Sequence, residues 1–436
     1  MLRGSVVAAA VLLCAGCPPS KSSLSQALGF LQVTQTTSWE ESTGASGSAA
    51  DFEGDWPQFF HFKSVPNYRI REVSPFVVAF IHHALTLIHE SNADALGLSQ
   101  AEIDAARNMR QRAVLFMKRF ESAEGEPDAH TYGFWPHDRN SLSPISPLET
   151  LAQSIMKGPL LGGDRVPLNL DYFPRALAIP TDADVTATTY TTLLDDALLD
   201  GGPGPAVSFE QFFADWRDTG AIPLRLTPDW LPHASGAYLT WLSYLAPPDA
   251  PIPNDVDLVV DANVLYALAR HGKTDTPGFA ETVALINSAV QQGLHRTRFE
   301  DLSSYYPDSF VFHYCVSRAY FEGPVPGLAA AVNALADDLE ASARIRADGT
   351  VCWDKGDPHL NTAFAVLTLL NAGRDSELLD GAIDYLQASQ DPRCGSWNEA
   401  VFFIARTDGG QVIEWESSAL TTAMALEAIA RFRLQD

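Results

Sequence analysis

The sequence has few positive charges: 29 Lys and Arg residues stand against 54 Asp and Glu residues, which gives a formal net charge of -25. Such a chain repels nucleic acid phosphates and anionic lipid head groups, so we exclude nucleic acid as a partner. The sequence also lacks a Gly-rich phosphate loop, a Gly-x-Ser-x-Gly nucleophile elbow and a paired-cysteine metal signature. We therefore expect neither a metal nor a cofactor.

Long apolar runs are also missing, since no stretch approaches the roughly eighteen uninterrupted apolar residues of a membrane-spanning helix. The N-terminus instead combines Arg3, a short apolar run from Val6 to Leu13 and small residues before Cys17. These are the parts of a cleavable secretory signal. The sequence therefore predicts a signal peptide over residues 1–16.

The end of this signal, Ala15-Gly16-Cys17, resembles the lipobox of bacterial lipoproteins, although Cys14 stands where that family has a large aliphatic residue. The resemblance implies that Cys17 carries a lipid that anchors the protein to a membrane. Because Pro18 rather than Asp follows, it also implies the outer membrane of a Gram-negative cell envelope. The alternative is an ordinary secretory signal with two incidental cysteines.

Only three cysteines remain after this point, namely Cys315, Cys352 and Cys394. An exported protein can form disulfides, and Cys352 and Cys394 lie in neighbouring repeat-like segments. Three free thiols are the other possibility, and the sequence leaves both open.

Residues 17–50 are rich in Ser, Thr, Gly and Ala, and we interpret them as a flexible tether. From residue 51 to 436 the pattern changes to apolar helical segments with small residues interleaved, as expected of helices packed on both faces. There are six, near residues 74–88, 184–199, 261–269, 312–321, 361–370 and 418–430. More amphipathic helices are predicted at 101–121, 278–296, 327–344 and 377–389.

Strand signals are weak throughout, and Pro-rich stretches separate the helices. Each repeat has one helix that must be buried and one that is half exposed. A closed ring of helical hairpins meets both requirements. The predicted fold class is therefore all-α: a single α/α toroid of about six hairpins over residues 51–436.

One segment near the C-terminus carries a resemblance to a known family. Tyr385-Leu386, Gln390 and Gly395-Ser396-Trp397 resemble the QW repeat of squalene-hopene and oxidosqualene cyclases. Weaker copies follow Ala113, ending in Gly133-Phe134-Trp135, and Leu339, ending in Trp353. In such a repeat the Gln caps a neighbouring helix and the Trp stacks over it. The resemblance implies the toroid of the terpene cyclase and prenyltransferase superfamily.

A second motif bears on activity. Asp182-Ala-Asp184-Val185-Thr186-Ala187 resembles the Asp-x-Asp-Asp-Thr-Ala motif of class II terpene cyclases, with Val185 in place of the last Asp. The resemblance implies that Asp184 protonates an alkene or epoxide and that Asp182 supports it. Clustered charges in an apolar cavity help to make such a strong acid. The alternative is that both carboxylates only cap the start of a helix.

Other side chains are candidates for substrate binding. Arg69 and Arg71 precede the first inner helix, where they can pair with Glu72, Asp182 or Asp184, or bind an anionic group of a ligand. Tyr238 and Trp241 are among the aromatic residues expected near helix ends, where they would line a central cavity. His82 and His83 are adjacent, so they cannot both face one ion easily, and we interpret them as structural.

Three functions remain open. The first is a terpene-cyclase-like enzyme that initiates cyclisation or isomerisation of a polyprenyl-type substrate by acid. The second is a cell-envelope protein that binds a hydrophobic ligand without chemistry. The third is a carbohydrate-active lyase or hydrolase with an open polar cleft, using His313 and Tyr314 or Tyr238.

Overall fold

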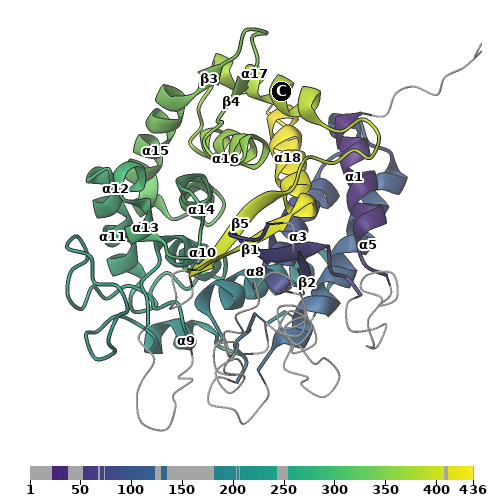
Figure 1. The fold of residues 1–436 in the computed structure, drawn as a ribbon. Helices are drawn as coiled ribbons and strands as arrows, with labels where there is room; N and C mark the ends of the chain where they lie inside the picture. The colour runs from purple at the N-terminus through teal and green to yellow at the C-terminus, as the bar shows by residue number, and fades with distance from the viewer. Residues whose placement is uncertain are drawn as a thin grey trace, which may run out of the picture.

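The computed structural model describes residues 22–37, 53–66, 69–72, 74–122, 129–134, 181–202, 204–205, 207–242, 254–406 and 411–435. These residues form a ring of helices with a small antiparallel sheet across one end (Figure 1). Cys17, on which the expected lipid anchor depends, lies outside the described residues. No helix within the described ranges is long and apolar enough to cross a membrane.

Six of the described helices form the inside of the ring and are buried along almost their whole length. They are α3 (Pro75–Glu90), α8 (Ala183–Asp200), α10 (Leu258–Arg270), α14 (Ser309–Phe321), α16 (Pro358–Asn371) and α18 (Ser418–Arg433). Each contacts the next, and α18 contacts α3, so the ring is closed. The six apolar segments predicted from the sequence fall on these helices, which confirms the α/α toroid.

All six inner helices begin in the same way, with a Ser or Asp side chain that accepts a hydrogen bond from a backbone N–H of the first turn. The capping residues are Ser74, Asp182, Asp257, Asp308, Asp357 and Ser417. Such a cap satisfies amide groups that have no intrahelical partner and contributes about 1 kcal/mol. The caps therefore fix where each buried helix starts.

A second layer of helices covers the outside of the ring. Its amphipathic members lie at the four predicted places: α5 (Gln100–Met117), α11 (Phe279–Gln291), α15 (Ala329–Ser342) and α17 (Glu377–Ser389). Short helices complete the description, namely α4 (Ala93–Leu96), η1 (Lys118–Phe120), α9 (Glu210–Asp215), α12 (Leu294–Thr297), α13 (Phe299–Leu302) and η2 (Pro326–Leu328).

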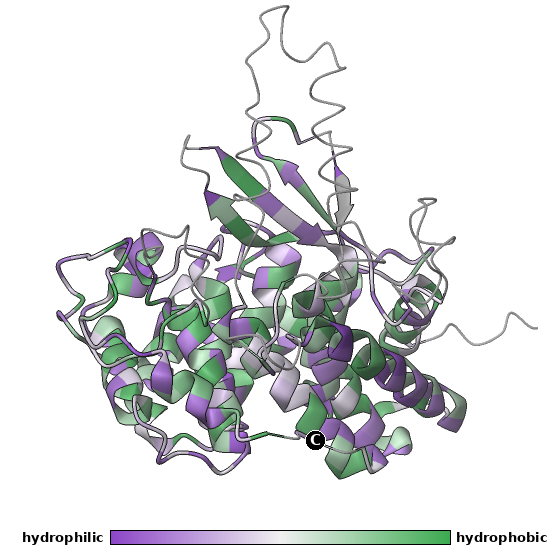
Figure 2. Ribbon diagram, turned by 90° about the horizontal axis from the view of Figure 1, so that it is seen from below, coloured by the Kyte–Doolittle hydropathy of each residue, from purple (hydrophilic) through white to green (hydrophobic). Residues whose placement is uncertain are grey.

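Strand signals in the sequence are weak, and no sheet was expected. One end of the ring nevertheless carries a sheet. Strands β1 (Gln58–Phe62), β2 (Ile70–Glu72), β5 (Ala400–Arg406) and β6 (Val412–Ser417) pair antiparallel in the order β2-β1-β6-β5. A separate hairpin joins β3 (Arg344–Ile345) and β4 (Val351–Cys352). The four-stranded sheet lies at the end where α18 starts, opposite the C-terminus of the chain (Figure 2). The central pairing, β1 with β6, joins segments more than three hundred residues apart, which local patterns do not reveal.

The tether expected over residues 17–50 is helical in part. Helix α1 (Ser23–Thr34) buries Leu24, Leu28 and Leu31 against α18 and α5. Residues 23–34 therefore belong to the toroid. From the sequence, the toroid was expected to start at residue 51 and these residues to belong to the tether, and this assignment is wrong for them. The apolar stripe of this helix is short and was obscured by the Ser and Thr residues around it.

Three tryptophans tie outer helices to the chain in one recurring way. The indole N–H donates to a leucine carbonyl near the end of an outer helix, at 2.8 to 3.0 Å: Trp56 to Leu31, Trp353 to Leu339 and Trp397 to Leu386. In the last two cases the tryptophan backbone N–H also bonds a threonine hydroxyl of the next inner helix, Thr362 or Thr422. Outer and inner layers are thereby linked.

Two glutamines extend these links around the ring. Gln390 donates to the carbonyls of Gly395 (2.8 Å) and Ser23 (3.0 Å), which joins the end of α17 to the start of α1. Gln35 does the same with Gly54 (3.1 Å) and Met109 (3.0 Å), which joins α1 to α5. Phe30-Leu31, Gln35 and Gly54-Asp-Trp56 thus repeat the pattern of the C-terminal segment. A long insertion before Gly54 hides this copy in the sequence.

Cys315 and Cys352 are buried and Cys394 is exposed, and all three are free thiols. Of the two possibilities that the sequence left open for them, the structure therefore shows unpaired cysteines.

We expect Leu28→Ala to lower the free energy of unfolding by about 2–5 kcal/mol, because it opens a cavity between α1 and α18. Val33→Ala, at an 85% exposed position of the same helix, should change it by less than about 0.5 kcal/mol. Urea unfolding of the two variants and the wild type measures both. Equal effects would mean that α1 is not part of the core.

Candidate active site

The two carboxylates of the predicted motif lie at the start of α8, and both are buried. Asp182 is the N-cap, and its Oδ1 accepts the backbone N–H of Val185 at 2.7 Å. The capping interpretation therefore describes Asp182. Asp184, within the first turn, makes no such bond and turns to other helices.

Asp184 is held by side chains from two neighbouring elements. Its Oδ1 accepts the amide N–H of Asn263 on α10 at 2.6 Å, and its Oδ2 is hydrogen-bonded to the hydroxyl of Tyr306, just before α14. The carbonyl oxygen of Asn263 in turn accepts Nη2 of Arg318 on α14 at 2.6 Å. The network joins α8, α10 and α14 inside the ring.

Arg318 provides the positive charge of this network. Its guanidinium lies over the rings of Phe80, Tyr266 and Tyr314, at 4.9, 4.5 and 5.3 Å from their centroids. Cation–π contacts of this kind stabilise a charge that has little water around it. Sequence patterns do not predict the pairing of Arg318, Asn263 and Tyr306, although a lone Arg and Asn within apolar helices were a usable signal.

Burial governs the protonation of the pair. It raises the pKa of Asp182 well above its usual range, and the charge of Asp184 raises it further. Burial also raises the pKa of Asp184, while the bonds from Tyr306 and Asn263 and the charge of Arg318 oppose this rise. Two carboxyl groups that are both removed from water favour retention of a proton on one of them. The pair is therefore suited to acid chemistry.

Aromatic rings occupy the space between this pair and the sheet. Phe76 lies 5.9 Å from Tyr306 and stacks on Phe402 at 5.8 Å. Tyr305 stacks on Phe403 at 5.8 Å, and Trp415 meets Phe403 edge-on at 5.2 Å. Faces of such rings stabilise cations. The surroundings of Asp184 are thus apolar and rich in π-electrons.

A small pocket lies inside the ring between α3, α8, α10 and α14. It is lined by His82, Thr188, Thr192, Tyr266 and Arg318, among others, and its volume of about 10 Å³ holds about one water molecule. Neither Asp182 nor Asp184 lines it. This pocket is therefore not an apolar cavity around the two carboxylates.

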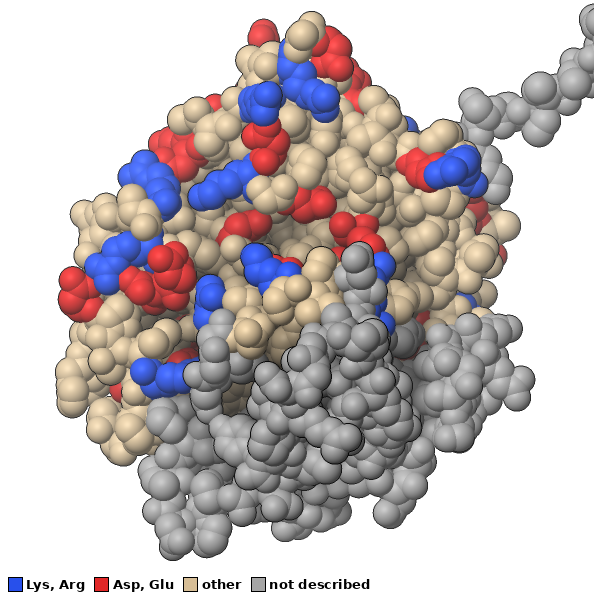
Figure 3. Space-filling view, viewed as in Figure 1, with Lys and Arg blue, Asp and Glu red and all other residues tan. Residues whose placement is uncertain are grey.

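The predicted arginines lie on the sheet, at the same end of the ring. Arg69 pairs with Glu399 (2.7 Å) and Glu416 (2.6 Å) and covers the ring of Phe59. One alternative from the sequence was that Arg69 pairs with Asp182 or Asp184. The structure shows it paired with Glu399 and Glu416 instead. The side chain of Arg71 lies outside the described part of the chain. Acidic and basic side chains lie close together on this face (Figure 3).

Of the two predicted aromatic residues, only Trp241 lies beside the carboxylates. Its backbone forms a bridge with Asp182, and its ring meets Tyr305 edge-on at 5.6 Å. Tyr238 is buried against Phe213 and beside Gly278, at the start of α11. It therefore packs between the layers of the toroid, apart from Asp184.

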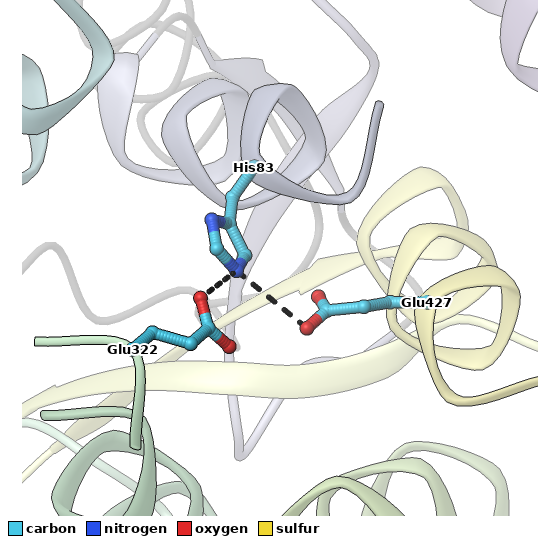
Figure 4. Close-up of side chains that lie close together, drawn as sticks. All are labelled: His83, Glu322 and Glu427. Atoms are coloured by element: carbon cyan, nitrogen blue, oxygen red, sulfur yellow. Dashed lines mark ion pairs between the residues drawn. The ribbon is translucent and has the colours of Figure 1, made fainter. Parts of the chain in front are cut away.

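The adjacent histidines point in different directions, as their spacing on a helix requires. His82 lies beside Thr86, and burial lowers its pKa well below the usual range. His83 faces Glu322 and Glu427 (Figure 4). A cavity of about 320 Å³ opens at this second group.

The side chains considered for carbohydrate chemistry are also separated. His313 bonds the carbonyl of Ser309 and packs against His295, whereas Tyr314 bonds Glu427. Burial lowers the pKa of His313 to about 4. The two residues therefore do not form one site.

The described helices form a terpene cyclase-like toroid. Type II terpene cyclase MstE from Scytonema, solved with its substrate geranylgeranyl dihydroxybenzoate, has a TM-score of 0.51 and 14% sequence identity, covering 95% of this chain and 97% of that chain. Its complex with the product merosterolic acid A gives 0.51 and 14%, covering 95% and 98%. The sequence matches no protein-family model and no curated protein. The likeness therefore concerns the fold.

We expect Asp184→Asn to change how stability depends on pH. The folded pKa of Asp184 is raised, so the folded state binds more protons, and the wild type loses stability relative to the variant as pH rises from about 4 to neutral. Asparagine fits the site, because its oxygen accepts from Asn263 and its amide donates to Tyr306. Urea unfolding at pH 4.5 and 7.5 measures the difference.

Asp348→Asn is the control for this measurement. Bonds from Thr350 lower the pKa of Asp348, so its contribution is lost only as pH falls. The wild type should therefore lose no stability against this variant between pH 4.5 and 7.5. The same trend for both variants would contradict the raised pKa of Asp184.

Proposed function

We propose that this protein binds a polyprenyl-type substrate at the sheet-covered end of the toroid and initiates its cyclisation or isomerisation by proton transfer from Asp184, supported by Asp182. The observation that carries this proposal is the buried network of Asp184, Asn263, Tyr306 and Arg318 beside a wall of aromatic rings. MstE, which shares the fold, was solved with a geranylgeranylated substrate.

The hydrogen bonds of the network determine which oxygen of Asp184 can carry the proton. Asn263 has only N–H donors to offer to Oδ1 of Asp184, whereas the Tyr306 hydroxyl can donate or accept. The transferable proton therefore belongs on Oδ2. Its transfer to an alkene carbon leaves a carboxylate, which Asn263 and Tyr306 stabilise, and a carbocation, which the aromatic rings stabilise. Loss of a proton from the cation back to a carboxylate completes the reaction.

The network also compensates for the missing third carboxylate of the motif. Val185 is buried among apolar residues and offers no hydrogen bond to Asp184 from its side chain. Arg318 polarises Asn263 instead, and this favours the ionised form of Asp184 that proton transfer creates. The positive charge of Arg318 thus strengthens the acid through Asn263, which lies between Arg318 and Asp184.

A second candidate function is hydrophobic ligand binding without chemistry. The cavity of about 320 Å³ at the other end of the ring supports it, because Leu87, Phe321, Leu370 and Leu434 contribute apolar walls. This cavity is not the proton-transfer site, since neither Asp182 nor Asp184 lines it.

For the location of the protein, we propose export and a lipid anchor at Cys17 in the outer membrane of a Gram-negative cell envelope. This proposal is supported by the sequence of residues 1–17 alone. It accords with a hydrophobic ligand, since such molecules partition into membranes.

We expect the purified protein to convert squalene or a geranylgeranylated phenol into a cyclised or isomerised product of equal mass. Asp184→Asn should lower the turnover by roughly 100-fold or more, because the general acid is lost. Gas chromatography with mass spectrometry of extracted lipids measures both. Asp308→Asn is the control, because it changes a half-buried capping carboxyl at the start of another inner helix.

Product formed equally by Asp184→Asn would overturn the assignment of the acid. Bound but unchanged lipid in wild type and variant would overturn catalysis and favour the binding function. Circular dichroism of each variant verifies that the fold is retained.

A further inference from the structure

A second group of ionisable side chains lies at the opposite end of the ring from the carboxylate pair. His83 comes from α3, Glu322 directly follows α14, and Glu427 comes from α18 (Figure 4). Nε2 of His83 lies 3.1 Å from Oε2 of Glu322 and 3.6 Å from Oε1 of Glu427. One ligand atom of each residue lies within 4.8 Å of the other two. Elements far apart in sequence therefore converge on one point.

This spacing matches that of ligands around a metal ion. Nitrogen and oxygen atoms bound to zinc at about 2.1 Å in tetrahedral geometry are about 3.4 Å apart. The distances of 3.1 and 3.6 Å from Nε2 of His83 lie on either side of that value. The three atoms can therefore contact one ion without a large rearrangement.

Further side chains orient the two carboxylates. Arg431 contacts Oε1 of Glu322 and lies 3.6 Å from Oε1 of Glu427, which leaves Oε2 of Glu322 directed at His83. The Tyr314 hydroxyl lies 3.3 Å from Glu427, and the Tyr266 hydroxyl lies 3.4 Å from Oε2 of Glu322. Outer partners of this kind fix the direction of metal-binding carboxylates. The arrangement has an inner set of three ligands and an outer set of donors.

The group also has an open side. His83, Glu322 and Glu427 line the cavity of about 320 Å³, together with the apolar residues Leu87 and Phe321. Glu427 is fully buried, so the carboxylate is drawn away from bulk water. Three protein ligands and an open position toward a cavity are the arrangement of zinc sites that also bind water or a small molecule.

We propose that His83, Glu322 and Glu427 bind a first-row divalent transition metal ion, represented here by Zn²⁺, whose free position faces this cavity. One imidazole and two carboxylates suit zinc or manganese better than Mg²⁺ or Ca²⁺, which prefer oxygen ligands alone. The proposed ligands are separate from the residues of the proposed acid chemistry at Asp184, although Arg318 packs between the two groups on the rings of Tyr266 and Tyr314.

The ion replaces a proton. Burial by itself lowers the pKa of His83, but Glu322 and Glu427 outweigh burial and raise it to about 10. Without an ion, His83 and the two glutamates lie at ion-pair distances from one another. Binding of Zn²⁺ at Nε2 releases this proton to the solvent.

The chain contains a natural contrast to this site. His61 also lies between two glutamates, but its Nε2 faces Glu414 at 3.2 Å and its Nδ1 faces Glu416 at 3.6 Å. Two nitrogens of one ring point in opposite directions, so these carboxylates cannot share an ion with one of them. His61→Gln is therefore the matched control for His83→Gln.

The test is a titration of the full-length, tag-free protein, first stripped with a chelator, with Zn²⁺ by isothermal calorimetry. We expect about one tight site per chain in the wild type and in His61→Gln, and its loss in His83→Gln and Glu427→Gln. Tyr314→Phe should retain the site and weaken it roughly 10- to 100-fold, because an outer donor is removed. Circular dichroism verifies the fold of each variant.

Replacement by Co²⁺ gives an answer that does not depend on variants. Visible absorption typical of four- or five-coordinate cobalt in the wild-type protein would support the site. The absence of stoichiometric binding in the wild type would overturn the proposal, as would binding that persists unchanged in His83→Gln and Glu427→Gln.

Discussion

Burial of six helices on all sides is the constraint on which this structure depends. An apolar helix with no polar face is stable in water only when neighbours cover it completely, and the inner helices achieve this by closing on one another where α18 packs against α3. The outer helices then pack around this closed inner ring. The bonds of Trp56, Trp397, Gln35 and Gln390 hold them there by joining α17, α1 and α5 in sequence.

The ring determines where polar chemistry can occur. Inside it, a charged group must find its partners on neighbouring helices, because water is largely excluded. Asp184 finds them on α10 and just before α14, and His83 finds them just after α14 and on α18. Arg318 lies between the two groups and packs on the Tyr266 and Tyr314 rings, whose hydroxyls bond the glutamates.

Sequence patterns were sufficient for the inner ring and insufficient for what connects it. Apolar segments and capping residues are local signals, so α3, α8, α10, α14, α16 and α18 could be predicted. The copy of the repeat around Gln35 and Trp56 escaped because an insertion separates its halves. Asp184 could be named from its motif, but Asn263, Tyr306 and Arg318 could not, since closure of the ring alone brings them together.

Stability alone does not explain the charges inside this ring. Removing two ions from water is costly, and replacement of a buried ion pair by apolar side chains of similar volume is often neutral or stabilising. A toroid selected only for stability would therefore tend to lose Arg318 with Asp184, and Glu427 with His83. The structure instead surrounds each carboxylate with oriented donors, at the expense of apolar contacts. The burial of these charges is therefore explained better by binding or proton transfer inside the ring than by stability alone.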